Sequence, residues 1–123
     1  MALDGMVQIK FGIYHLERLL KMGNLISNEM LKSIPNLYET EDQNDPLCHI
    51  KLFTPDANFT WYIIEVSIDE NLCYGYVKGL ENELGYFSLD EIADIRGSLG
   101  LKVERDSLFK PTLLSKIRSN TDV

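Results

Sequence analysis

The strongest constraint on the fold is a series of β-forming segments in the middle of the chain, joined by very short connections. Four segments rich in β-branched and aromatic residues span residues 47–54, 59–68, 72–79 and 84–88. The PDAN, DEN and LENE segments between them are typical of turns. Because parallel neighbours need a crossover of a dozen or more residues, these connections predict an antiparallel meander of about four strands.

Helical patterns precede the strands. Residues 7–22 begin with alternating apolar residues and then change to helical spacing. Residues 27–34 carry a second apolar stripe that starts at a favourable N-cap, Ser27, and ends before Pro35. The turn-rich, acidic segment that follows, up to residue 46, is expected to form a loop.

Further elements follow the strands. Ser88 and Glu91 form a capping box at the start of a central helix. Residues 101–105 predict a short strand with positions 101 and 103 inward, and Pro111 suits the first turn of a final helix with apolar positions 113, 114 and 117. The sequence therefore predicts one α+β domain over residues 1–123, with an antiparallel sheet of four to five strands and N-terminal, central and C-terminal helices packed on it.

Composition and cysteine usage favour a soluble protein of the cytoplasm. The 123 residues are 45% hydrophobic and 25% charged, and no stretch approaches the roughly 20 apolar residues of a membrane span. The N-terminal region is interrupted by charged residues, so no signal peptide is expected. Cys48 and Cys73 belong to no C-x-x-C pair and are expected to be reduced thiols in the core.

The net charge of −7 is unevenly distributed. Residues 1–95 carry a net charge of −10, whereas residues 96–123 carry +3. Strong binding of nucleic acid through bulk charge is therefore not expected. The acidic side chains either are solvated and neutralised within the fold or form a patch that attracts a basic partner. The candidate patch consists of Glu39, Glu41, Asp42, Asp45, Glu81 and Glu83.

Strict alternation along the strands places aromatic and charged side chains together on one sheet face. Such a face suits a docking partner, because aromatic rings offer a large contact area and the lysines can meet an anion. The alternative is that helices cover part of this face and that Glu65 pairs with a lysine across the strands. The candidate residues are Lys51, Phe53, Trp61, Glu65, Tyr74, Tyr76 and Lys78.

The sequence shows little that is typical of an enzyme. There is no G-x-S-x-G or phosphate-binding glycine loop, and Cys48 and His49 are adjacent in a strand, so their side chains point to opposite faces. No metal site or cofactor is expected, since the two cysteines and two histidines lack a zinc-binding spacing. A small enzyme that uses Glu65, Glu83 or Glu104 as acid or base remains an alternative.

Several motifs are shared, in order, with a known family. They are P-x-L-Y-x-T-E from Pro35, E-L-G-Y-F-S-L over residues 83–89 and R-G-x-x-G-L-x-x-E-R-D over residues 96–106. On these motifs the chain resembles the bacterial domain-of-unknown-function family 2958 over a core of residues 35–111, with residues 1–24 as a helical N-terminal extension. An inward Arg105 is expected to form ion pairs that tie the C-terminal segment to the sheet. The polar motif residues of interest are Tyr86, Arg96, Glu104, Arg105 and Asp106.

The resemblance implies a small bacterial protein encoded on plasmids and integrative elements, near genes for DNA handling and antirestriction. With the charge distribution, it favours a non-enzymatic, inhibitor-like module that binds a protein partner, such as a nucleic-acid-handling or host-defence enzyme. The alternative is an accessory protein that binds nucleic acid through the basic segment 96–118, with Trp61 and the tyrosines as stacking platforms.

Overall fold

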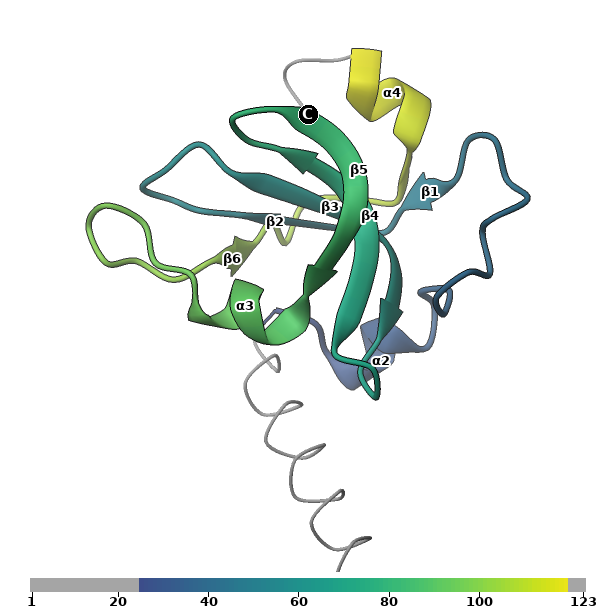
Figure 1. Ribbon diagram of the computed structural model, residues 1–123, viewed down its shortest axis with the longest axis horizontal. Coiled ribbons are helices and arrows are strands. Elements are labelled where there is room, and N and C mark those ends of the chain that lie inside the picture. Colours follow the sequence, from purple (N-terminus) through teal and green to yellow (C-terminus); the bar gives the residue numbers. More distant parts are fainter. Residues whose placement is uncertain (1–24, 120–123) are drawn as a thin grey trace, which may run out of the picture.

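The centre of the molecule is a curved, five-stranded antiparallel sheet. The structure, a computed structural model, describes residues 25–119, so the helix predicted within residues 7–22 lies outside them. The strand order is β5-β4-β3-β2-β6, which confirms the predicted α+β fold and meander (Figure 1). The strands are β2 (Ile50–Phe53), β3 (Thr60–Ser67), β4 (Leu72–Lys78), β5 (Asn82–Ser88) and β6 (Glu104–Arg105).

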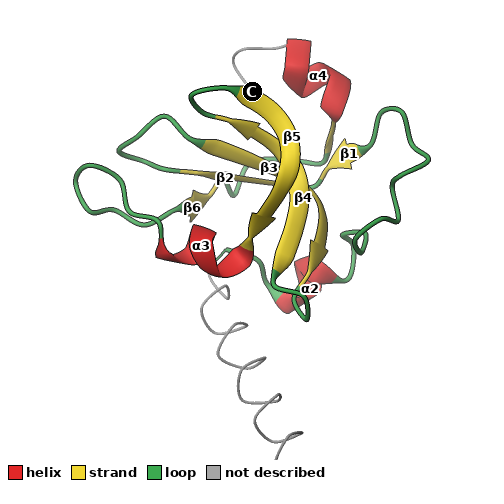
Figure 2. Ribbon diagram, in the orientation of Figure 1, coloured by secondary structure: helices red, strands yellow, loops and turns green. Residues whose placement is uncertain are grey.

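A second, two-stranded sheet and three short helices complete the described part of the chain (Figure 2). The strand predicted over residues 47–54 is divided at residue 49 into β1 (Leu47–Cys48) and β2. β1 pairs with β7 (Thr112–Leu113), a pairing that the sequence did not predict. The helices are α2 (Asn28–Leu31), α3 (Leu89–Asp94) and α4 (Leu114–Ser119).

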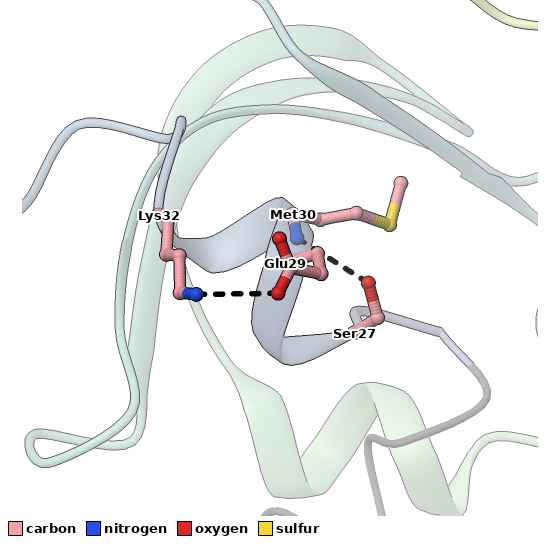
Figure 3. Close-up of polar contacts among 4 residues, drawn as sticks. All are labelled: Ser27, Glu29, Met30 and Lys32. Carbon is pink, nitrogen blue, oxygen red and sulfur yellow. Dashed lines mark hydrogen bonds and ion pairs between the residues drawn. The ribbon is translucent and has the colours of Figure 1, made fainter.

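α2 is capped as predicted but ends early. The Ser27 hydroxyl accepts a hydrogen bond from the Met30 N–H at 3.3 Å, and Lys32 forms an exposed ion pair with Glu29 at 3.2 Å (Figure 3). The Ser33 N–H and hydroxyl both donate to the Met30 carbonyl, which closes the turn and ends the helix at Leu31 rather than at residue 34.

α3 begins at the predicted cap. The Ser88 hydroxyl accepts from the Glu91 N–H at 3.3 Å, and Asn71 accepts from the Leu89 and Asp90 N–H groups through its carbonyl and its side chain. Together these bonds satisfy three orphan donors of the first turn.

The C-terminal helix starts three residues later than predicted. Pro111 lies before β7, and α4 begins at Leu114. Leu113 is therefore a partly exposed strand residue, whereas Leu114 and Ile117 are buried as expected for an inward helix face.

The sheet has a hydrophobic core on each of its two faces. One core packs β2, β3 and β4 against the regions of α2 and α3, and the other packs the opposite face against α4. Figure 1 shows α2 and α3 on one side of the sheet and α4 on the other. Cys73 lies in the first core and Cys48 in the second, both as buried free thiols, which confirms the prediction. Burial raises the pKa of both thiols, that of Cys48 to about 12.

The predicted strand at residues 101–105 is shorter than expected. Only Glu104 and Arg105 pair with β2, Val103 is buried, and Leu101 is 47% exposed instead of inward. The preceding residues are held in a loop conformation by contacts that the sequence pattern did not reveal.

Those contacts come from Asp56, in the β2–β3 connection. Its Oδ2 accepts hydrogen bonds from the Leu99 N–H at 2.6 Å and the Leu101 N–H at 3.3 Å. A Cβ at residue 97 would lie 1.6 Å from Asp56 Oδ1, so the carboxylate fits only against Gly97. The two loops lie side by side at one end of the molecule (Figure 2).

Candidate functional site

The strand register sorts the candidate face into rows. Residues directly opposite each other in an antiparallel pair point to the same side of the sheet. Glu65, Tyr74 and Tyr86 are opposite one another across β3, β4 and β5 and form one row. Tyr62 and Tyr76 belong to the next row.

The register also shows that Trp61 lies on the other face, so its expected place on the candidate face is wrong. Trp61 is opposite Leu52 and Val77 and is 6% exposed in the core beneath α2 and α3. A bulge between Ile63 and Glu65 inserts an extra residue and brings Glu65 to the face of Tyr74. Strict alternation cannot include such an insertion, and it therefore put Trp61 and Glu65 on the same face.

The middle of the candidate face is covered. Tyr76 is 6% exposed and packs with Tyr62, α4 and Phe109 in the second core. The Arg118 guanidinium lies 5.3 Å from the centre of the Tyr76 ring. The face is therefore divided into two separate cavities.

The first, here called the lysine cavity, has a volume of about 560 Å³ and includes Lys51, Phe53, Lys78 and Asp106. Lys51 Nζ lies 3.7 Å from the Asp106 carboxylate, and the Asp106 N–H donates to the Lys51 carbonyl. Lys78 Nζ lies 5.8 Å from the centre of the Tyr62 ring. Both ammonium groups are therefore engaged by the protein itself.

The second, here called the tyrosine cavity, has a volume of about 500 Å³ and lies between the loop of residues 36–44, the Glu65 row and α4. Tyr86 is 50% exposed, and its ring centre is 4.9 Å from that of Tyr74 and 6.2 Å from that of Tyr38. The cavity is lined by Thr40, Glu41, Gln43, Asn44, Pro46, Glu65, Tyr74, Leu84, Tyr86, Leu114 and Arg118.

Glu65 fixes one wall of the tyrosine cavity. It is 2% exposed, its Oε1 accepts from the Tyr38 N–H at 2.8 Å, and its Oε2 accepts from the Thr40 N–H at 2.9 Å and from the Thr40 hydroxyl. The expected cross-strand pair of Glu65 with a lysine is thus replaced by bonds to a loop more than 20 residues away. These bonds hold the loop against the sheet and stabilise the left-handed backbone of Tyr38, at φ 71°.

Three charged side chains line the tyrosine cavity, namely Glu41, Glu65 and Arg118. The pKa of Tyr86 is raised, first by burial and then by the neighbouring Tyr38, Glu65, Tyr74 and Glu41, so the ring keeps its neutral hydroxyl. The Glu41 side chain is exposed and makes no hydrogen bond or ion pair with any other residue in the range 25–119. Its carboxylate is therefore available to a ligand.

The six predicted acidic residues do not form one patch. Glu39, Glu41 and Asp42 are exposed on the 36–44 loop. Asp45 accepts from the Ser115 N–H at 2.8 Å and from the Ser115 hydroxyl at 2.7 Å, and these bonds lower its pKa. Glu81 lies in the β4–β5 turn, and Glu83 is opposite Val77 on the face of Trp61.

Within residues 25–119, Arg105 does not form the expected ion pairs with carboxylates. Its Nη1 donates to the Leu25 carbonyl at 2.9 Å and contacts the Met30 sulfur at 3.3 Å. It thus joins the edge strand β6 to the α2 region through a carbonyl rather than through an ion pair.

The other polar motif residues are also dispersed. Arg96 donates to the carbonyls of Ala93, at 3.1 Å, and Ile95, at 2.8 Å, near the end of α3. Glu104 is opposite Phe53 and lines a different cavity, whereas Tyr86 belongs to the tyrosine cavity.

Two residues of the tyrosine cavity region were missed by the sequence reasoning as site residues. Tyr38 belongs to the P-x-L-Y-x-T-E motif, and its place in that motif was the available signal. Arg118 is four residues beyond Leu114, one helical turn away, so its approach to the sheet could be predicted only with the helix boundary known.

Two other kinds of feature are absent from the part of the chain that the structure describes. Between residues 25 and 119, no three His, Cys, Asp or Glu side chains are grouped so that they could hold a metal ion. Within the same range, no helix has the length and apolar character needed to cross a bilayer.

Comparison with known proteins identifies a family. No curated protein and no solved structure matches the chain. A family model described as "Protein of unknown function (DUF2958)" matches residues 22–118, a longer segment than the 35–111 core on which the resemblance rests. That segment includes α2, the whole sheet and nearly all of α4, so the chain belongs to the DUF2958 family.

Proposed function

We propose that the protein is a non-enzymatic interaction module that binds a basic surface of a protein partner through its 36–44 loop. The observation that carries the proposal is the attachment of this loop to Glu65, which fixes the backbone at Tyr38 and Thr40. The acidic side chains of Glu39, Glu41 and Asp42 are exposed on that fixed backbone.

A fixed acidic loop suits partner recognition for two reasons. Ordering a free loop on binding costs free energy, and a loop already held by the sheet avoids much of this cost. Clustered carboxylates also attract a basic surface and raise the association rate. A nucleic-acid-handling or host-defence enzyme offers such a basic surface in its nucleic-acid channel. A protein that binds there would act as an inhibitor. This role fits the mobile-element and cytoplasmic setting that the resemblance implies.

The geometry supports this function better than catalysis. Both oxygens of Glu65 accept hydrogen bonds from the loop, so this carboxylate serves to anchor it. Glu104 lines another cavity, and Glu83 points to the opposite face of the sheet from Tyr86. The three carboxylates considered as acids or bases therefore do not converge on one site.

The geometry also gives little support to nucleic-acid binding through residues 96–118. Trp61 is buried and cannot stack on a base. Within the basic segment, Arg105 donates to the Leu25 carbonyl, and Arg118 lies over the Tyr76 ring. Binding of a basic protein therefore remains the better-supported proposal.

The test is affinity capture from the native host at low and at moderate salt, with the full chain as bait. A triple variant, Glu39→Gln, Glu41→Gln and Asp42→Asn, should lose a partner that the wild-type chain retains, because the attractive charge is removed. The matched control carries Glu29→Gln, Glu70→Gln and Glu91→Gln, the same charge change at exposed positions away from the loop. Recovery of no specific protein, or equal recovery by both variants, would overturn the proposal.

A further inference from the structure

We propose that the tyrosine cavity binds the guanidinium group of an arginine side chain from the partner. The inference rests on the proposed function and deepens it, because it names the chemical group that the acidic loop recognises. The group would lie beside Tyr86, between its ring and the Glu41 carboxylate.

The aromatic side chains provide the first part of the argument. Tyr38, Tyr74 and Tyr86 form a continuous ring cluster, with centres 4.9 and 6.2 Å apart and interplanar angles of 47° and 50°. Tyr38 and Tyr86 are about half exposed, at 53% and 50%. Exposed tyrosine rings tilted against one another present ring faces to a planar cation, which a guanidinium contacts better than an ammonium.

The carboxylates provide the second part. Glu41 lines the cavity and has no ion-pair partner in the described range, and Glu65 adds a second, buried negative charge to the same wall. Both carboxylates line the same cavity as Tyr86, and after burial they are among the causes that raise the pKa of its hydroxyl. A cation beside Tyr86 therefore meets the exposed Glu41 carboxylate and an aromatic face, with the buried Glu65 carboxylate behind them.

The protein's own α4 provides the third part. Arg118 lines the same cavity, and its guanidinium already lies 5.3 Å from the Tyr76 ring centre at the α4 end. This contact holds the Arg118 cation at Tyr76, which does not line the cavity, rather than at Tyr86. The volume of about 500 Å³ is within the range of ordinary ligand pockets and leaves room for a second, external side chain near Tyr86.

The test uses an arginine compound in place of the partner. Full-length, ¹⁵N-labelled protein is titrated with N-acetyl-arginine amide and, separately, with the neutral N-acetyl-citrulline amide, which has nearly the same shape. The arginine compound should give saturable shifts in the millimolar range at the amides of Tyr38, Thr40, Tyr74 and Tyr86, and the citrulline compound should give none. Equal shifts with both compounds, or none with arginine, would overturn the inference.

Variants localise the site. Glu41→Gln and Tyr86→Leu should each weaken arginine binding by about threefold to tenfold, as expected for loss of a charge or an aromatic face. Tyr86→Phe should bind like the wild type, because the ring face remains. The control, Glu39→Gln, removes the same charge two residues away but outside the cavity lining, and it should change the affinity by less than twofold. If Glu39→Gln weakens binding as much as Glu41→Gln, the site is the loop charge as a whole and the inference is wrong.

The two proposals fail separately. If arginine does not bind but a host partner is still lost with the acidic loop variant, only the inference falls. If arginine binds at the tyrosine cavity but no partner depends on the loop, the inference stands and the proposed function falls.

Discussion

Two glycines that face each other in the sheet differ in how much space a side chain would have there. Gly75 in β4 is opposite Gly85 in β5. A Cβ at Gly75 would lie 2.0 Å from the Tyr62 carbonyl oxygen, in the backbone of β3 just before the bulge. A Cβ at Gly85 would meet no atom within 4 Å. Only the first glycine is therefore required by the close approach of a neighbouring strand.

This difference predicts the effect of adding one methyl group. Gly75→Ala should reduce the free energy of unfolding by about 3 kcal/mol or more, because a backbone carbonyl cannot move away as a side chain can. Gly85→Ala should leave it unchanged or raise it by up to about 1 kcal/mol through the lower entropy of the unfolded chain. Urea denaturation followed by tryptophan fluorescence measures both values. Similar values for the two variants would contradict the close approach at Gly75.

At the scale of elements, the start of α4 is held by hydrogen bonds to a carboxylate outside the helix. Asp45 accepts two hydrogen bonds from Ser115 in the first turn of α4, and these bonds lower its pKa in the folded state. The ionised form is thus bound more tightly in the folded chain than in the unfolded chain. The resulting stabilisation is complete above the pKa of an unfolded aspartate, about 3.9, and is lost as the pH falls through the folded value.

The pH dependence of the Asp45→Ala variant should follow this sign. Near neutral pH its melting temperature should lie below that of the wild type, because two bonds to α4 are missing. The difference should shrink as the pH falls below about 4, where the wild-type carboxyl becomes protonated. Thermal melts by circular dichroism from pH 7 to pH 3 measure it, with Asp42→Asn as the control. A difference that is constant over this range would show that Asp45 does not act through its charge.

The strands could be predicted from the sequence, whereas the bulge and the cavity could not. Alternating apolar and aromatic residues predicted the four central strands, because the core on each face depends on that alternation. The face predicted for Trp61 was wrong because a one-residue bulge has no compositional signal. The tyrosine cavity could not be predicted, since only the fold brings Tyr38 to Tyr86 and places Tyr86 and Arg118 in the same cavity.

At the scale of the whole molecule, each core contains one thiol. Cys73 and Cys48 are both fully buried, on opposite faces of the sheet. Their pKa values are raised by burial, so neither is a thiolate at neutral pH, and neither is within reach of a reagent in the folded chain.

The two thiols should therefore report separately on the opening of each core. Native protein should react with a thiol-specific colorimetric reagent only at the rate at which each core opens, whereas protein in urea should expose both thiols at once. Gly75→Ala should speed the reaction of Cys73 and Cys48 together if the sheet opens as one unit. Mass spectrometry of the labelled peptides identifies which thiol reacts, and rapid labelling of native wild-type protein would contradict their burial.

The anchoring of the 36–44 loop by Glu65 has a consequence for variation among related chains. Glu65 binds the backbone N–H groups of Tyr38 and Thr40, and the Thr40 hydroxyl is the loop side chain that it contacts. The side chains at positions 39, 41 and 42 do not hold the loop in place, so they are interchangeable without loss of its shape. One sheet can thus carry different recognition chemistries as these positions mutate, much as a fixed loop framework does in other binding proteins.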